Sequence, residues 1–159
     1  TDPYMLDTMF TAHEDAQSEY TYTDDLPVGT RAEVIDVCML ARLHNLLRDP
    51  DSSEYMTYML RRPDLFRTLE VPAPQPVLNR PEIRLTVDTY EDLQVIRSIY
   101  AAFDGALPKL EEIIQWLDAN PQVKNLNSDL EPTPLPTKVN CSLVGDEPHF
   151  KAEFNRVGR

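Results

Sequence analysis

Asp88 is the residue best placed to bind a metal ion, because it directly follows a segment with alternating side chains. Ile83, Leu85 and Val87 alternate with polar residues, a period-2 pattern typical of a β-strand. In open α/β sheets, ligands bind beyond the carboxyl ends of strands. A carboxylate there can bind Mg²⁺, which takes oxygen ligands from one or two carboxylates and from substrate phosphates. The alternative is a carboxylate that flanks a helix start, where the helix dipole favours negative charge.

Asp92 has a structural explanation that Asp88 lacks. Thr89 and Asp92 have the spacing of a capping box, in which the side chains at the first and fourth positions each bond the other's backbone amide. This pattern predicts that a helix begins directly after Thr89. We therefore interpret Asp92 as a structural residue.

Three arginines are candidate ligands for anions, since a guanidinium binds carboxylates and phosphates through two parallel hydrogen bonds. Arg61 and Arg62 end a predicted helix, where cations also suit the dipole, so ordinary surface placement is the alternative. Arg84 lies on the polar face of the predicted strand and could either reach the same crevice or face solvent. Gly29 is expected to serve a turn, and Glu33 is either a solvated carboxylate or a polar wall of a pocket.

Other side chains that often carry chemistry show no recognisable pattern. His13, His44 and His149 lack metal-ligand spacing, so we expect surface or satisfied histidines. Cys38 and Cys141 make neither a zinc motif nor a disulfide framework, and Cys38 is predicted to be a small buried apolar residue. The four glycines have neither Walker nor dinucleotide spacing, so no phosphate-binding loop is expected in this chain.

Composition argues against two classes of partner. The chain has 27 acidic and 15 basic residues and a net charge of -12, which argues against a broad nucleic-acid-binding surface. Its longest apolar run, Val37 to Ala41, is far shorter than the ~18 to 20 residues that a membrane span requires. The aromatic residues fall mostly on apolar helical stripes, and we expect them in the core. With no signal-peptide pattern at its acidic start, we expect a fragment of a cytoplasmic protein.

The elements that must position these residues alternate between helix and strand, which predicts an α/β fold. We expect three to four strands and a sheet that continues N-terminally. Residues 1–127 are predicted to form the folded part, and the proline-rich residues 128–159 to form a tail or linker. The predicted helices cover residues 3–17, 36–48, 52–62, 90–103 and 108–119, and the predicted strands cover 20–22, 33–35, 66–71 and 83–87.

A series of short motifs resembles one enzyme family. Residues 84–93, RLTVDTYEDL, closely resemble the RLTVDTPEDL segment of cytidylyltransferases of the spore coat polysaccharide biosynthesis type, relatives of the acylneuraminate-activating enzymes. The run SEYMT…RRPDLF at 53–66 resembles the family's EHVT…RRHPELF, and LPVG…EV at 26–34 its LPxGxxxEV. The start at residues 2–7 and the end at 114–127 are also similar. The resemblance spans roughly residues 2–130, in order.

The resemblance implies a nucleotide-diphosphosugar-transferase-like fold, a Rossmann-like three-layer sheet. The implied reaction is attack by a sugar hydroxyl on the α-phosphate of CTP, which yields a CMP-sugar and pyrophosphate for surface glycans. The implied partners are CTP and a sugar or sugar acid, and the implied cofactor is Mg²⁺. By resemblance Asp88 is the metal ligand, and the substrate-binding residues on the sugar side are Gly29, Glu33, Thr57, Arg61 and Arg84.

The family's N-terminal nucleotide-binding half, with its CTP loop and first metal-binding Asp, is expected before Thr1 and is absent from this chain. We therefore expect this fragment to be inactive by itself. Tyr55 and Tyr90 replace a common His and Pro of the family, which leaves the sugar open. The alternative is a non-catalytic α/β interaction or dimerisation module. A homodimer is expected because half a sheet leaves an unpaired strand edge.

Overall fold

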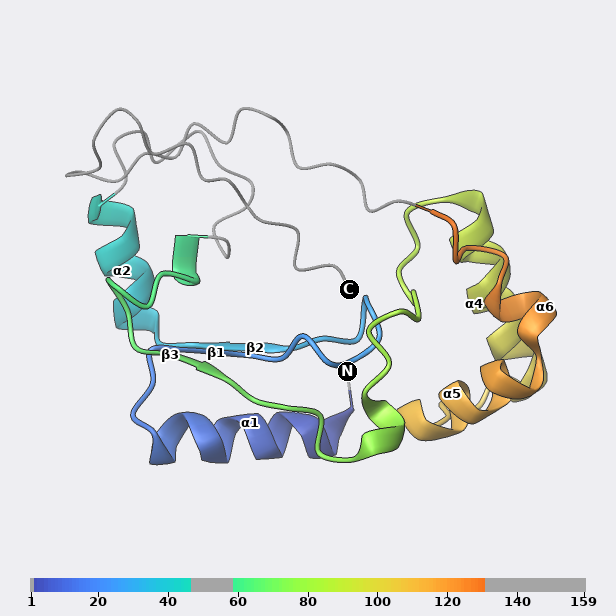
Figure 1. Ribbon diagram of the computed structural model, residues 1–159, viewed down its shortest axis with the longest axis horizontal. Helices are drawn as coiled ribbons and strands as arrows, with labels where there is room; N and C mark the ends of the chain where they lie inside the picture. The colour runs from blue at the N-terminus through green and yellow to red at the C-terminus, as the bar shows by residue number, and fades with distance from the viewer. Residues whose placement is uncertain (1, 47–58, 131–159) are drawn as a thin grey trace.

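The computed structural model describes residues 2–46 and 59–130 and shows a mixed α/β fold around a small sheet (Figure 1). The three strands of this described part lie in the order β2-β1-β3. The elements are α1 (Pro3–Asp15), β1 (Tyr20–Tyr22), β2 (Glu33–Ile35), α2 (Val37–Leu46), β3 (Thr68–Glu70), the 3₁₀ turn η2 (Pro76–Leu78), α4 (Tyr90–Ala102), α5 (Leu110–Ala119) and α6 (Pro121–Lys124).

The strand register decides which side chains face which helix. β1 pairs antiparallel with β2, so that Tyr20 lies opposite Ile35 and Thr21 opposite Val34. β3 pairs with the other edge of β1 in parallel, with Leu69 opposite Thr21. Because side chains alternate along a strand, Tyr20 and Ile35 share one face of the sheet, and Thr21 and Val34 the other.

Helices cover both faces of the sheet. The N-cap Asp2 accepts a hydrogen bond from the Tyr4 amide at 2.9 Å and starts α1, which buries Met5 and Met9 on the face that carries Val34. On the opposite face, α2 buries Met39 and Leu43 against Tyr20, Leu60 and Phe66. The sheet therefore lies between α1 and α2, as Figure 1 shows.

The C-terminal helices extend the core that α1 begins. α4, α5 and α6 gather at one end of the molecule (Figure 1). Leu26, Leu78 and Ile83 connect them to α1 within one apolar cluster. The C-terminal helices contribute Val95, Ile99, Leu110, Ile114 and Leu117 to that cluster.

Most of the predicted elements are confirmed, but the strand at 83–87 is wrong. Arg84 makes an isolated parallel bridge with Val28, in which the Val28 amide donates to Ile83 and the Leu85 amide to Val28, both at 2.8 Å. The pairing stops after one residue because the amides that would extend it are used in turns: the Ile83 amide donates to the Arg80 carbonyl and the Thr30 amide to the Pro27 carbonyl, both at 3.0 Å. The predicted alternation is thus present in a segment whose partner is too short to make a strand.

One burial prediction is also wrong, and a second is confirmed only in part. Cys38 is exposed, because α2 turns its Met39 and Leu43 face to the core and leaves Cys38 outside. The prediction that the aromatic residues lie in the core holds for five of the nine in the described ranges, whereas four are exposed, namely Tyr4, Phe10, Tyr90 and Tyr100. The helix predicted at 52–62 falls mainly, and the tail at 128–159 almost entirely, outside the described residues. Over residues 2–46 and 59–130, no helix combines the length and apolarity needed to cross a membrane.

Candidate functional site

A polar groove beside β2 brings together two of the predicted substrate-binding residues, Glu33 and Arg61. The groove has a volume of about 430 Å³. We call it the β2 groove, and its lining residues are Thr23, Asp24, Arg31, Ala32, Glu33, Ile35 and Arg61. Two cations and two carboxylates line it, so its charges balance.

Arg61 is held in place by a carboxylate and an aromatic ring. Its guanidinium donates two hydrogen bonds to Asp24, at 2.6 and 3.0 Å, and lies 4.1 Å from the centre of the Tyr22 ring. Arg31 lies 3.5 Å from the same carboxylate. Burial by itself would lower the pKa of Arg61. The hydrogen bonds to Asp24 and Tyr20 outweigh this effect and raise the pKa above its usual range, so the residue stays charged.

Glu33 accepts a short hydrogen bond from the buried Tyr20 hydroxyl, at 2.6 Å. Burial, together with the nearby Glu33 carboxylate, raises the pKa of Tyr20 well above its usual range. The phenol therefore stays protonated and acts as the donor. The contact fixes one oxygen of Glu33 at the wall of the β2 groove.

Gly29 lies in the loop before β2 and makes a close backbone approach. Its φ of 95° is in the region that favours glycine, and a Cβ there would lie 2.8 Å from the Leu85 carbonyl carbon and the Thr86 nitrogen. The expected turn at Gly29 is confirmed. Close packing against Leu85 and Thr86 is a second reason why this position requires glycine. Through this contact the loop before β2 lies against the segment that carries Arg84 and Asp88.

A buried hydrogen-bond network surrounds Asp92, and we call it the Asp92 network (Arg84, Asp88, Thr89, Asp92 and Asn127). Arg84 donates to both Asp92 oxygens, from Nε at 2.9 Å and from Nη2 at 3.2 Å, and its Nη2 also donates to Asp88 at 2.6 Å. The Asn127 amide donates to Asp92 at 2.8 Å. The backbone amides of Asp88 and Thr89 donate to Asp92, and Thr89 accepts from the Asp92 amide, so the predicted capping box is confirmed.

Burial would by itself raise the pKa of Asp92, but the hydrogen bonds from Arg84, Asn127 and two backbone amides hold that pKa well below its usual range. In the unfolded chain an Asp titrates near pH ~3.9. As the pH falls through this value, the unfolded chain binds a proton that the folded chain does not, so the free energy of unfolding decreases.

We predict that the stability lost between pH 6 and pH 3 is smaller in Asp92→Asn than in the wild type. Urea unfolding at pH 6, 5, 4 and 3 measures this difference. Other carboxylates, such as Asp118, titrate in both proteins and cancel in the comparison. Equal losses in the two proteins would show that Asp92 does not contribute to the acid sensitivity.

Asp88 lies two residues before α4, at the predicted helix start, but the segment before it is not the strand whose carboxyl end was expected to position it. Its side chain is 56% exposed, and its Oδ2 is paired with Arg84. Within the described residues, no group of three or more His, Cys, Asp or Glu side chains could hold a metal ion by itself. A Mg²⁺ ion at Asp88 would have this one carboxylate as its ligand among the described residues, and phosphates and water would supply the other ligands.

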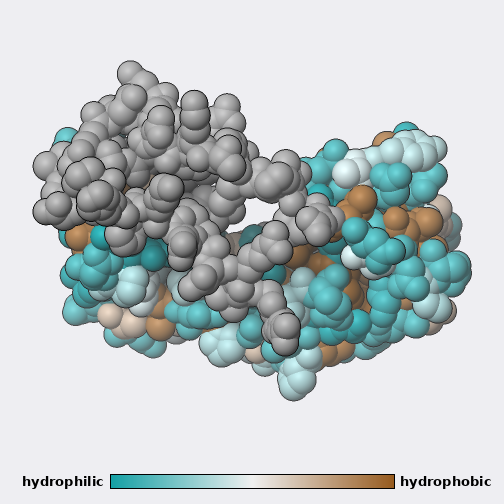
Figure 2. Space-filling view, turned by 45° about the horizontal axis from the view of Figure 1, so that its top comes forward, coloured by the Kyte–Doolittle hydropathy of each residue, from teal (hydrophilic) through white to brown (hydrophobic). Residues whose placement is uncertain are grey.

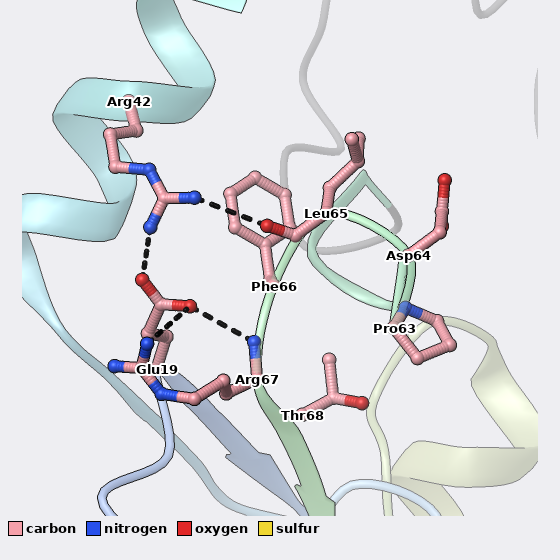
Figure 3. A pocket seen from close by; sticks show the side chains of 8 residues that line it. All are labelled: Glu19, Arg42, Pro63, Asp64, Leu65, Phe66, Arg67 and Thr68. Atoms are coloured by element: carbon pink, nitrogen blue, oxygen red, sulfur yellow. Dashed lines mark hydrogen bonds and ion pairs between the residues drawn. The ribbon is translucent and has the colours of Figure 1, made fainter.

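A larger depression lies where β1 and β3 begin and contains none of the predicted site residues (Figure 3). Its nearly buried Glu19 accepts hydrogen bonds from Arg42 and from the Arg67 backbone amide, and pairs with the Arg67 guanidinium. Arg42 also donates to the Leu65 carbonyl and lies over the Phe66 ring. These charges are paired with one another and connect α2 to the starts of β1 and β3. We therefore interpret the depression as a structural contact between these elements and not as a binding site.

The structure separates the predicted residues into three places. Glu33 and Arg61 line the β2 groove, Gly29 packs against Leu85, and Arg84 joins Asp88 in the Asp92 network. Thr57 lies outside the described residues.

Three residues of these sites carried no functional prediction, namely Tyr20, Asp24 and Asn127. Asp24 lies two residues after the end of β1, so the positional reasoning used for Asp88 could have found it. Asn127 is 43 residues from Arg84 and 35 from Asp92 along the chain, and no local sequence pattern indicates that it bonds to them.

Comparison with known proteins gives two curated relatives, and no family model matches the chain. The chain is 34% identical over 124 residues to spore coat polysaccharide biosynthesis protein SpsF of Bacillus subtilis, which covers 76% of this chain and 51% of that protein. It is 31% identical over 113 residues to the uncharacterized protein MJ1063 of Methanocaldococcus jannaschii, covering 70% and 46%. The chain thus spans about half the length of these relatives.

A solved structure has a similar fold. A cytidylyltransferase from Leptospira borgpetersenii superposes with a TM-score of 0.64 at 19% identity, over 82% of this chain and 55% of the other. At this identity the match supports the mixed α/β fold alone.

Proposed function

Because this chain belongs, over 76% of its length, to the cytidylyltransferase family of the spore coat polysaccharide biosynthesis type, we propose that it is the sugar-side part of a nucleotidyltransferase. The whole protein would transfer CMP from CTP to a sugar or sugar acid for polysaccharide biosynthesis. The nucleotide-binding loop would come from a part of the protein other than the residues printed here. A cytoplasmic location and a homodimer belong to the same proposal.

The observation that carries the proposal is the β2 groove, in which Glu33 and Arg61 come together. Sugar hydroxyls both donate and accept hydrogen bonds, so a wall of paired carboxylates and guanidinium groups suits them. The Tyr20 hydroxyl occupies one oxygen of Glu33, and the carboxylate can accept a sugar hydroxyl at the other. Arg61, fixed by Asp24 and Tyr22, offers a rigid cationic wall.

In the proposed reaction, a sugar hydroxyl oxygen forms a bond to the α-phosphorus of CTP. The bond from that phosphorus to the oxygen that bridges it to the β-phosphorus breaks, pyrophosphate leaves with the electron pair, and the hydroxyl proton passes to water. Asp88 would hold Mg²⁺, which supplies charge neutralisation at the phosphates. The part of the chain described above would orient the sugar through Glu33 and Arg61. The Val28–Arg84 bridge connects the loop before β2 to the segment that carries Asp88.

A second candidate function is a non-catalytic interaction or dimerisation module. It is favoured by apolar residues at the surface, which gather over the C-terminal helices on the visible face (Figure 2). Leu107 is 87% and Val87 55% exposed. An apolar patch at the surface often marks an interface, because binding of a partner removes its side chains from water.

Pyrophosphate release decides between these candidates. The whole protein is given CTP, Mg²⁺ and a panel of neutral sugars and 2-keto sugar acids. We expect release that depends on the sugar, that falls at least about tenfold in Asp88→Asn, and that needs more sugar in Glu33→Gln. Asp118→Asn, which removes an exposed partner of Arg80, is the matched control and should behave as the wild type. A folded protein that releases no pyrophosphate with any sugar would favour the interaction module.

A further inference from the structure

We infer that Arg84 is a positioning residue rather than a substrate ligand, and that Arg84, Asp92 and Asn127 together fix the Asp88 carboxylate for the metal ion. This inference rests on the proposed function in one respect, the role of Asp88 as a metal ligand. It assigns roles to Asp92 and Asn127 beyond the helix cap.

Three of the five N–H donors of the Arg84 guanidinium are used inside the protein. Its Nε and Nη2 donate to the two oxygens of Asp92, and Nη2 is shared with Asp88. Its side chain is 12% exposed, and that of Asp92 is fully buried. Either two-donor edge of the guanidinium needs Nη2, and the Nη2 donors go to Asp92 and Asp88, so Arg84 is not available to clamp a substrate through two parallel hydrogen bonds.

Asp88 is fixed at two points. Its backbone amide donates to Asp92 at 3.0 Å, and its Oδ2 accepts from Arg84 at 2.6 Å. Among the residues that the structure describes, none donates a hydrogen bond to its Oδ1. Arg84 therefore holds Oδ2 of Asp88, while the side chain stays exposed and Oδ1 remains for a metal ion. This arrangement suits a metal-binding carboxylate with a fixed orientation.

Asn127 closes the network from the C-terminal side of α6. Its amide donates to Asp92 Oδ1 at 2.8 Å and to the Arg84 carbonyl at 3.1 Å, and the residue is almost fully buried. Asn127 thus holds the Asp92 carboxylate, to which the Arg84 side chain is paired, and also the Arg84 backbone. Because Asn127 is uncharged, replacing it changes positions in the network without changing its charge.

Charge and orientation would affect the metal in opposite directions. A cation beside Asp88 repels Mg²⁺, so an apolar residue in place of Arg84 would remove this repulsion and the orientation together. Charge-conserving variants separate the two effects. Loss of a group that hydrogen-bonds to a metal ligand typically lowers metal affinity or activity by about 10–100-fold.

The test uses the whole protein and its variants Arg84→Lys and Asn127→Ala. Two quantities are measured with CTP present: binding of Mn²⁺, a probe for the Mg²⁺ site, by electron paramagnetic resonance, and the Mg²⁺ concentration for half-maximal pyrophosphate release. We expect both variants to bind Mn²⁺ about 10-fold or more weakly, with a much smaller change in kcat at saturating Mg²⁺. Asp118→Asn breaks an Arg–Asp pair of the same kind outside the network and should leave both quantities unchanged.

The outcomes distinguish this inference from the proposed function. If Asp88→Asn weakens Mn²⁺ binding while both folded variants bind it as the wild type does, the positioning role is wrong and the proposed function stands. If Asp88→Asn and the wild type bind Mn²⁺ equally, the metal role of Asp88 fails, and the positioning role fails with it. Urea unfolding shows which variants are folded. If Arg84→Lys does not fold, Mn²⁺ binding by Asn127→Ala alone tests the positioning role.

Discussion

Replacing Arg84 with Met is expected to lower the free energy of unfolding by about 3–5 kcal/mol. The reason is that Asp92, which is fully buried, would remain as a carboxylate without its cation. Met fills a similar volume, so the loss would come from charge rather than from a cavity. Urea unfolding at pH 7 measures the change.

Asp88→Asn is the matched control for Arg84→Met. It removes the exposed partner of the same guanidinium and should cost no more than about 1 kcal/mol, because the Asp88 side chain is 56% exposed. Adding Asp92→Leu to Arg84→Met should recover part of the lost stability, since a buried apolar pair can replace an ion pair. A loss in Arg84→Met no larger than in Asp88→Asn would contradict the assignment of a buried ion pair.

Gly29→Ala is expected to cost about 3 kcal/mol or more. A non-glycine residue at positive φ costs roughly 1–2 kcal/mol, and the added Cβ would lie 2.8 Å from backbone atoms of Leu85 and Thr86. Backbone cannot move aside as the end of a flexible side chain does, so relief requires the Val28–Arg84 bridge to open. The melting temperature and the urea midpoint both report this loss.

Gly105→Ala separates the two causes. Gly105 also has a positive φ, of 74°, but a Cβ there meets no atom within 4 Å. Its replacement should cost about 1–2 kcal/mol, the conformational part alone. Equal losses at the two glycines would mean that the close approach to Leu85 adds nothing.

Local signals in the sequence predicted most of the elements. The capping box at Thr89 and Asp92 and the Pro3 start of the first helix are complete within a few residues, so no distant partner is needed to identify them. The 83–87 segment had an equally clear local pattern. It is not a strand, because strand formation depends on a partner, and the partner Val28 pairs over a single residue.

The site was predictable only in part for the same reason. Glu33 and Arg61 were chosen by resemblance, and the structure places both in the β2 groove. That Arg84 is engaged with Asp92 follows from the turn between residues 84 and 92, whose geometry the sequence does not specify. The contribution of Asn127 depends on the path of three intervening helices. The predicted role of Thr57 stays a prediction.

The link from Asn127 to Asp92 also orders events during synthesis of the chain. The two residues are 35 positions apart, so a nascent chain that has just added Asp92 must grow for another 35 residues before the amide exists. At about 5–20 residues per second, this takes roughly 2 to 7 seconds. During that interval the Asp92 carboxylate has Arg84 nearby but lacks its last donor. The helix cap at Thr89 can therefore form on the ribosome during this interval, whereas the segment that carries Asp88 reaches its final arrangement only after Asn127 has been added.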